Sequence, residues 1–278
     1  MNATYAADDF AQRFGGIARL FGIGGLARLR AAHVCVVGVG GVGSWIIEAL
    51  ARSGVGAITM VDLDDVCVTN VNRQLPAHDG NIGRPKVDAL AERVRLIQPE
   101  CSVTAIAEFF TGASAAEFLS PRYDFVIDAI DALSNKCLLI ASCRERGLPV
   151  LTIGGAGGKR DPTAVRICDL AKSVQDDLLK YVRRKLRQDY GFPRDVFADF
   201  GVACVYSPEK PAFPWADGTC SSKKEPGSAL ALDCASGFGA AAFVTGAFGF
   251  AAAGEVVRRI AEAQSFPCTG NSSVSTNR

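Results

Sequence analysis

Residues 34–62 read VCVVGVGGVGSWIIEALARSGVGAITMVD, and this stretch decides the expected fold. An apolar run at 34–37 leads into a turn that contains Gly38, Gly40, Gly41 and Gly43. A helical pattern follows at 44–53, and a second apolar run ends in Asp62. Glycines let the backbone approach a phosphate, and a helix N-terminus offers free N–H groups and a positive dipole end. An acid at this distance can bind ribose hydroxyls, so the stretch predicts a nucleotide-binding βαβ unit.

The same alternation continues along the chain. We expect helices at 8–31, 85–97 and 134–146 and strands at 102–107, 125–128 and 150–153. Alternating strands and helices predict an α/β, Rossmann-like, doubly wound and mostly parallel sheet, here with a C-terminal extension. Later segments include an amphipathic helix at 176–188, an irregular segment at 191–229 and a last helix ending near Ala263.

We expect one domain over 8–263. Its nucleotide-binding half is 8–154, and 155–263 carries the crossover, the substrate side and a dimer interface. Residues 264–278 are polar and predict a disordered tail.

Bulk composition excludes several classes of protein. The 278 residues are 49% hydrophobic and 21% charged with a net charge of +1, so nucleic acid must be bound by a local patch. None of the ten cysteines is spaced C-x-x-C, which argues against a four-cysteine zinc site. The absence of a signal-peptide pattern predicts reduced thiols in a cytoplasmic protein. The uncharged segment 235–254 is rich in alanine and glycine, which favours a buried or interface helix over a membrane span.

Polar and charged residues after the glycine turn distinguish this chain from the dehydrogenases that share that turn. They are Asp64, Asn70, Arg73, Gln74, Lys86, Asp128 and Asp131. Hydride transfer does not need this set, but attack on the α-phosphate of ATP does. Arg73 and Lys86 can neutralise triphosphate oxygens, and Asp131 at the end of a strand can hold Mg²⁺. A NAD-dependent dehydrogenase and a non-catalytic nucleotide-binding scaffold are therefore disfavoured.

These motifs, in this order and spacing, resemble the ubiquitin-activating-enzyme superfamily of ATP-dependent adenylating enzymes (ThiF/MoeB type). The matching pieces are GVGGVG at 38–43, DLDDV at 62–66, NRQ at 72–74, Lys86 and DAID at 128–131. Four further pieces are most similar to its bacterial tRNA threonylcarbamoyladenosine dehydratases: RFGG at 13–16, DVCVTNVNRQ at 65–74, GGAGG at 154–158 and DCASGFGA at 233–240. The resemblance covers roughly residues 8–262.

The resemblance implies roles for individual residues. Gly40 and Gly41 would line ATP, Asp62 would bind the ribose, and Asn70, Arg73 and Lys86 would face the phosphates. Asp131 would lie at Mg²⁺ and the adenylation centre. Arg13 matches an arginine that relatives insert into the neighbouring subunit's ATP site, which implies a homodimer; without the resemblance it reads as a surface arginine.

The resemblance also implies the substrate. The threonyl carboxylate of the modified adenosine in tRNA would be adenylated with loss of pyrophosphate, and a nitrogen of the same side chain would then close a ring as AMP leaves. The alternative is adenylation of the C-terminus of a ubiquitin-like sulfur carrier. Many enzymes of that branch carry paired C-x-x-C zinc sites, which this sequence lacks.

Three further features allow two interpretations each. Cys234 lies near an expected helix start, where a thiolate is favoured. It would take part in sulfur chemistry with a cysteine desulfurase or sulfur acceptor. The other interpretation is a small buried residue. The basic stripe Lys180, Arg183, Arg184 and Arg187 would contact tRNA, or it is a solvated helix face. The glycine turn 154–158 would hold Na⁺ or K⁺ through its carbonyls, or it is a tight turn.

Overall fold

The computed structural model describes residues 3–120, 122–226 and 238–263, with side chains from residue 9 onward. The helices are α1 (Ala3–Ala31), α2 (Gly43–Arg52), α3 (Lys86–Ile97), α4 (Ala115–Phe118), α5 (Leu133–Glu145), α6 (Asp177–Asp189) and α7 (Ala242–Ala261). The strands are β1 (His33–Val37), β2 (Ala57–Val61), β3 (Ser102–Ile106), β4 (Phe125–Asp128), β5 (Val150–Ile153), β6 (Arg166–Asp169), β7 (Ala203–Tyr206), β8 (Phe213–Pro214) and β9 (Cys220–Ser221). Short 3-10 turns lie at η1 (Val68–Asn70), η2 (Pro162–Ala164) and η3 (Leu170–Lys172).

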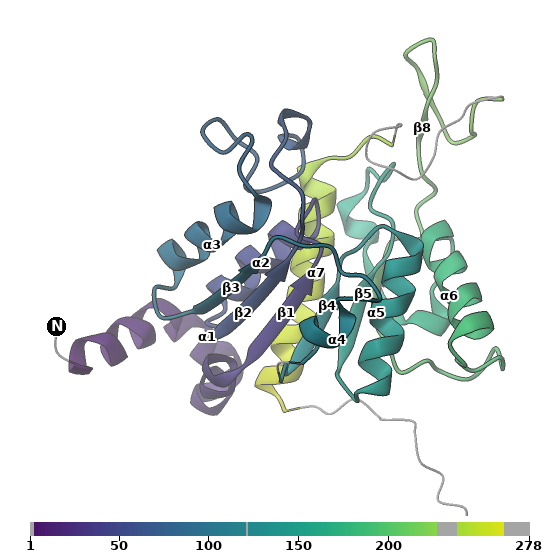
Figure 1. Cartoon of the computed structure of the whole chain (residues 1–278). Coiled ribbons are helices and arrows are strands. Elements are labelled where there is room, and N and C mark those ends of the chain that lie inside the picture. The colour runs from purple at the N-terminus through teal and green to yellow at the C-terminus, as the bar shows by residue number, and fades with distance from the viewer. Residues whose placement is uncertain (1–2, 121, 227–237, 264–278) are drawn as a thin grey trace, which may run out of the picture.

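A 7-stranded sheet in the order β3-β2-β1-β4-β5-β7-β6 organises the molecule (Figure 1). The pairings from β3 across to β7 are parallel, and β6 runs antiparallel at the edge. This arrangement confirms the predicted doubly wound, mostly parallel sheet. The strand order reverses between β1 and β4, which is where open α/β sheets form a ligand crevice at their carboxyl edge.

The predicted C-terminal extension of the sheet consists of β7 and β6, but neither strand was located from the sequence. The expectation that 191–229 is irregular was wrong, because β7 and the short hairpin β8–β9 lie inside it. β7 is only 4 residues long and is buried on both faces. It therefore lacks the alternation of polar and apolar residues that identifies a half-exposed strand.

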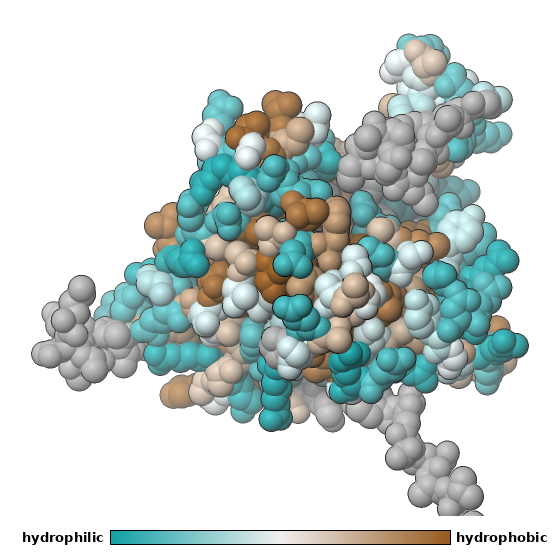
Figure 2. Space-filling model, in the orientation of Figure 1, coloured by the Kyte–Doolittle hydropathy of each residue, from teal (hydrophilic) through white to brown (hydrophobic). Residues whose placement is uncertain are grey.

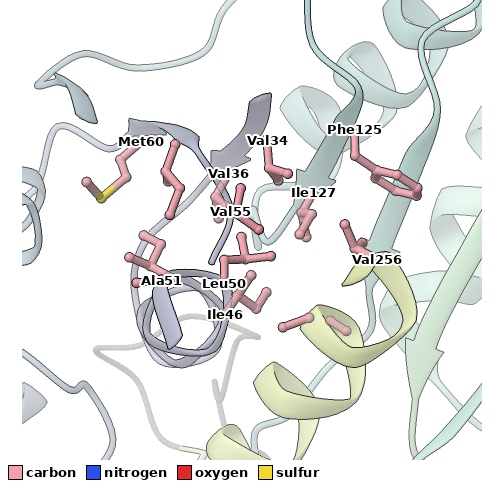
Figure 3. Close-up of a cluster of buried hydrophobic side chains, with 14 of the residues drawn as sticks. Val34, Val36, Ile46, Leu50, Ala51, Val55, Met60, Phe125, Ile127 and Val256 are labelled. Carbon is pink, nitrogen blue, oxygen red and sulfur yellow. The ribbon is translucent and has the colours of Figure 1, made fainter. Parts of the chain in front are cut away.

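Each face of the sheet has its own apolar core. One core joins the strands to α2, α3 and α7, and Figure 3 shows Val34, Val36 and Ile127 pointing toward Ile46 and Leu50 of α2. The other core lies under α4, α5 and α6. In Figure 1, α4 and α5 lie in front of the sheet, whereas α2 and α7 lie behind it. These two layers leave the carboxyl edge of the central strands open.

Close packing of α7 explains why the uncharged segment 235–254 is rich in small residues. A Cβ atom built on Gly249 would lie 2.6 Å from the Cβ of Trp45, so α7 packs against α2 too closely for a side chain there. Val244, Phe248 and Ala252 on the same helix are buried, which supports a packed helix. Among the described residues, no helix combines the length and apolarity needed to cross a membrane. Residues 235–237 and the predicted tail 264–278 lie outside the described ranges.

Candidate active site

A cavity of about 440 Å³ lies at the carboxyl edge of the sheet, above β1, β2, β4 and β5. Figure 2, in the orientation of Figure 1, shows apolar residues near the middle of the molecule with hydrophilic residues around them. Strand ends, the glycine loop and three crossing segments form the wall. The polar and charged members of the lining are Asp62, Asp64, Asn72, Arg73, Gln74, Lys86, Glu108, Asp131, Asn135 and Thr245.

The glycine loop connects β1 to α2 and forms the floor of the cavity. Gly38 has φ 88° and a Cβ there would lie 2.7 Å from the carbonyl oxygen of Ala129, so the loop passes close to the end of β4. A Cβ on Gly43 would lie 1.9 Å from the carbonyl oxygen of Gly38. Gly38, Gly40 and Gly41 line the cavity, whereas Gly43 allows the helix to pack against the strand end. The N-terminus of α2 therefore faces the cavity with its positive dipole end.

Asp62 and Lys86 meet at the end of β2. The Asp62 carboxylate accepts hydrogen bonds from the backbone N–H groups of Val39 (2.8 Å) and Asp64 (2.9 Å). Burial raises the pKa of Asp62, and the neighbouring Lys86 opposes that shift. The Lys86 Nζ lies 2.7 Å from the Asp64 carboxylate and 4.0 Å from that of Asp62. Lys86 is nearly buried yet remains in the cavity wall, so an anion entering the cavity meets a desolvated ammonium group.

The Arg73 segment is fixed by hydrogen bonds from α2 and α7. The Arg73 carbonyl accepts hydrogen bonds from the indole N–H of Trp45 on α2 and from the hydroxyl of Thr245 on α7, both at 3.1 Å. The Asn72 side chain donates to the carbonyl of Ala240 at 2.7 Å. The guanidinium of Arg73 itself donates to the carbonyl of Thr69 at 2.7 Å. The backbone is thus held in place, and Arg73 belongs to the cavity wall.

The side-chain oxygen of Gln74 is buried without a hydrogen-bond partner among the described residues. Gln74 lines the cavity, and its amide nitrogen lies 3.6 Å from where a Cβ of Gly40 would be. A buried acceptor left unpaired costs about 1–3 kcal/mol. This atom is therefore positioned to accept a hydrogen bond from a ligand beside the glycine loop.

Besides Gly43, two predicted nucleotide contacts, Asn70 and Asp128, do not line the cavity. Asn70 is buried, and its side-chain oxygen accepts a hydrogen bond from the backbone N–H of Cys67 at 3.0 Å, so it shapes the loop. Asp128 is fully buried behind the wall and accepts hydrogen bonds from the Thr152 hydroxyl (2.6 Å) and the Ile130 N–H (3.1 Å). The Asn70 amide and the Asp128 carboxylate thus form hydrogen bonds within the protein, whereas the sequence predicted that both would contact the nucleotide.

Asp131 lies three residues beyond Asp128 and lines the cavity. The loop that carries it is held by Lys136, a fully buried lysine on α5. The Lys136 Nζ lies 2.9 Å from the Asp128 carboxylate and donates to the carbonyl of Ile130 at 2.8 Å. Burial raises the pKa of Asp128, and the charge of Lys136 opposes that shift. The buried pair therefore supports the loop from below and leaves Asp131 on the cavity side.

The glycine turn 154–158 forms the wall opposite β2. Asp176 precedes α6 and accepts hydrogen bonds from the backbone N–H groups of Gly155 and Leu179, both at 2.9 Å. Burial raises the pKa of Asp176, and these two hydrogen bonds oppose the shift. A Cβ on Gly154 would lie 2.4 Å from an Asp176 oxygen. The turn is thus shaped by a carboxylate on its outer side.

Arg13 and Cys234 are not brought to this cavity by the described residues. Arg13 is exposed on α1, pairs with Asp9 at 2.7 Å and donates to the carbonyl of Ile97 at 3.3 Å. It does not line the cavity of its own chain. Cys234 falls in 227–237, outside the described residues.

The basic stripe of α6 is narrower than the sequence suggested. Lys180 and Arg184 are exposed, but Arg183 donates to the Ser173 hydroxyl and Arg187 donates to the carbonyl of Pro193 at 3.0 Å. The predicted apolar side is confirmed, because Leu179, Val182 and Leu186 are buried. Only half of the stripe is therefore directed wholly to solvent.

Several supporting residues were missed from the sequence. Trp45, Lys136, Asp176 and Thr245 fix the loops of the cavity, and none belongs to the motifs quoted above. Lys136 lies in the first turn of α5, shortly after the DAID motif. This closeness to the motif is the one sequence signal that could have identified it.

Comparison with known proteins agrees with this geometry. The profile of the ThiF family matches residues 16–275. A tRNA threonylcarbamoyladenosine dehydratase of Haemophilus influenzae is 48% identical over 258 residues, which cover 93% of this chain and 97% of that protein. The Escherichia coli tRNA N6-threonylcarbamoyladenosine dehydratase solved in complex with ATP is 44% identical with a TM-score of 0.81, covering 93% of this chain and 98% of that one. The same enzyme in complex with AMP gives a TM-score of 0.82 at 45% identity, covering 92% and 96%.

Proposed function

Because this chain belongs to the ThiF family, we propose that it is an ATP-dependent dehydratase that cyclises threonylcarbamoyladenosine in tRNA. One observation carries the proposal: a single cavity brings together the glycine loop, Arg73, Lys86 and Asp131. Relatives that align with nearly the whole chain are dehydratases of this kind, and one of them is solved with ATP. Because these relatives align with nearly the whole chain, they favour this substrate over the C-terminus of a sulfur carrier.

The cavity suits ATP in its charge and hydrogen bonding. Gly40 and Gly41 allow the phosphates to approach the backbone at the positive end of α2. Asp62 can accept hydrogen bonds from the ribose, and the unpaired oxygen of Gln74 supplies another acceptor. Lys86 would exchange its contact with Asp64 for a phosphate oxygen, which is favourable because the ammonium group is already desolvated.

The reaction follows from placing a carboxylate beside the α-phosphate. A carboxylate oxygen attacks the α-phosphorus, the bond to the bridging oxygen breaks, and pyrophosphate leaves with its electron pair. A nitrogen of the same side chain then attacks the acyl carbon, loses its proton to solvent, and AMP leaves. The tRNA loses one water in total, which is consumed in the conversion of ATP to AMP and pyrophosphate. Arg73 and Lys86 stabilise the charge that develops during the first step.

Mg²⁺ would be held by Asp131 together with phosphate oxygens. No group of three or more histidine, cysteine, aspartate or glutamate side chains within the described ranges is arranged to hold a metal. The single carboxylate of Asp131 fits Mg²⁺, because this ion is usually bound by one or two carboxylates together with waters and substrate phosphates. When bound, it would supply charge neutralisation at the phosphates. A Na⁺ or K⁺ ion at the turn 154–158 is a further part of the proposal.

The partners proposed for this chain are tRNA and a second copy of itself. Arg13 is exposed and does not line the cavity of its own chain, as expected for a residue that completes the site of a neighbouring subunit. Lys180 and Arg184 are the exposed cations of α6 that would contact tRNA phosphates. Residues 8–263 would act as one adenylating domain in the cytoplasm, and any cysteine desulfurase or sulfur acceptor would act through Cys234.

The test is AMP formation from ATP and Mg²⁺ with tRNA that carries threonylcarbamoyladenosine, compared with unmodified tRNA. We expect AMP with the modified tRNA alone, and a nucleoside lighter by one water in mass spectrometry. Arg73→Ala and Lys86→Ala should lower AMP formation by at least about 100-fold with unchanged circular dichroism. Arg95→Ala, an exposed arginine on α3 outside the cavity, is the matched control. AMP without a change in the nucleoside would move the substrate to a carrier protein.

A further inference from the structure

Two cysteines outside the cavity face each other across the edge of the sheet. Cys168 on β6 and Cys204 on β7 are directly paired in the antiparallel register. Their sulfur atoms lie 3.8 Å apart. Side chains at directly opposed positions of an antiparallel pair share one face of the sheet, so the two thiols meet without any change in the fold. Neither residue lines the ATP cavity.

The two thiols differ in access to solvent. β6 is the edge strand, and Cys168 is half-buried. Cys204 lies on the neighbouring interior strand and is fully buried. A reagent from solvent therefore reaches Cys168 first, and the next sulfur beyond it is that of Cys204.

The electrostatic environment favours the Cys168 thiolate. The hydrogen bond from Cys204 lowers the pKa of Cys168 to about 7, although burial acts in the opposite direction. The buried thiols Cys35, Cys101 and Cys143 behave differently, because burial raises the pKa of each. Since the thiolate is the attacking species in thiol chemistry, Cys168 stands apart from the interior cysteines.

We propose that Cys168 and Cys204 form a thiol-modification site that takes up a small-molecule disulfide such as oxidised glutathione. The Cys168 thiolate attacks one sulfur of the disulfide, a Cys168–glutathione bond forms, and one glutathione thiolate leaves. Cys204 then loses its proton to solvent and attacks the Cys168 sulfur, and the second glutathione leaves as thiolate. Two protein thiols are oxidised to one disulfide, and oxidised glutathione is reduced to two thiols.

The structure explains why the second step can follow the first. The pKa of Cys204 is raised first by its hydrogen bond to Cys168 and then by burial. Once Cys168 carries glutathione it is no longer a thiolate, so the larger of these two causes disappears. The distance between the two sulfur atoms needs to shorten from 3.8 Å to a bond length of about 2 Å. The Cα atoms of directly opposed residues lie roughly 4.5–5.5 Å apart, which is within the range that disulfides accept.

The experiment uses the full reduced chain incubated with defined mixtures of oxidised and reduced glutathione. Free thiols are then alkylated, and the protein is analysed intact and after proteolysis by mass spectrometry. We expect the loss of two alkylatable thiols and a peptide in which Cys168 is joined to Cys204. Cys204→Ser should instead accumulate glutathione on Cys168, because the resolving thiol is missing. Cys168→Ser should leave Cys204 as a thiol.

Cys67 provides an internal comparison. It is exposed, and hydrogen bonding with Thr69 lowers its pKa, so it competes for the same reagent without a facing thiol among the described residues. Glutathione at Cys67 with Cys168 and Cys204 both alkylated would overturn the proposal. So would a Cys204→Ser protein, folded by circular dichroism, that carries no glutathione at Cys168. Cys204→Ala repeats the test if the serine variant does not fold.

Discussion

Replacing Lys136 by methionine tests whether the buried ion pair holds the wall of the cavity. Methionine keeps most of the apolar stem but removes the ammonium group. The change deletes the 2.9 Å contact with Asp128 and the 2.8 Å hydrogen bond to the carbonyl of Ile130. Both side chains of the pair are 0% exposed, so water cannot replace the lost charge.

The expected cost follows from that burial. Removing one member of a buried ion pair destabilises a protein by about 3–5 kcal/mol, because the other charge is left uncompensated. For a chain of this size, 1 kcal/mol corresponds to a shift of about 2–4 °C in Tm. Lys136→Met should therefore lower the Tm by roughly 10 °C. AMP formation should also fall at temperatures where the variant is folded, since Ile130 belongs to the cavity wall.

The matched control is the double variant Asp128→Asn with Lys136→Met. It removes both charges, while the asparagine oxygen can still accept from Ile130 or Thr152. Unfolding is followed by circular dichroism or calorimetry, and we expect the double variant to recover most of the loss. A single variant that melts within about 2 °C of the wild type, or a double variant that melts no higher than the single one, would refute the reasoning.

Three further predictions concern the glycine loop, the Arg73 segment and an ion-pair cluster on α2 and α3. Gly43→Ala places a Cβ 1.9 Å from the Gly38 carbonyl oxygen, so we expect a lower Tm and no stabilisation by ATP in a thermal-shift assay, whereas Gly40→Ala should fold normally because its nearest neighbour is 3.6 Å away. Thr245→Val removes a hydroxyl that donates to the Arg73 carbonyl, so the KM for ATP should rise several-fold with a stability loss of about 1 kcal/mol; equal KM values would contradict this role. Burial would raise the pKa of Glu48, but hydrogen bonds from Arg93 and Arg52 outweigh it and hold that pKa below its usual range. The stability this adds is complete above the unfolded pKa of about 4.3 and is lost as pH falls through the lower folded value. Urea unfolding between pH 3 and 7 should therefore show a gap between wild type and Glu48→Gln that closes only at the acid end.

The first βαβ unit was predictable because its signals are local. A run of buried strand residues, a cluster of turn glycines and one amphipathic helix all lie within 34–62. The structure places β1 and α2 within one residue of the predicted bounds, and β2 ends directly before Asp62. Periodicity and turn chemistry act over short distances, so no knowledge of the rest of the fold was needed.

The motif residues were harder to assign, because a motif does not say which of its members faces the ligand. Asp128 and Asp131 lie in the same four-residue motif, yet the first is buried behind the wall and the second lines the cavity. The difference comes from Lys136 and Thr152, which reach Asp128 from α5 and β5. Strands β6 and β7 were not predicted for a related reason, because they are recognisable only from their pairing with one another and with β5.

The hydrogen bond from Thr245 to the Arg73 carbonyl joins residues 172 positions apart in the chain, and that from Asn72 to Ala240 spans 168. Synthesis on the ribosome proceeds from the N-terminus, so the glycine loop and Arg73 leave the ribosome long before the helix that holds them. A nascent chain therefore has no complete nucleotide site until α7 has emerged. Prematurely terminated products that lack α7 would therefore not form AMP from ATP.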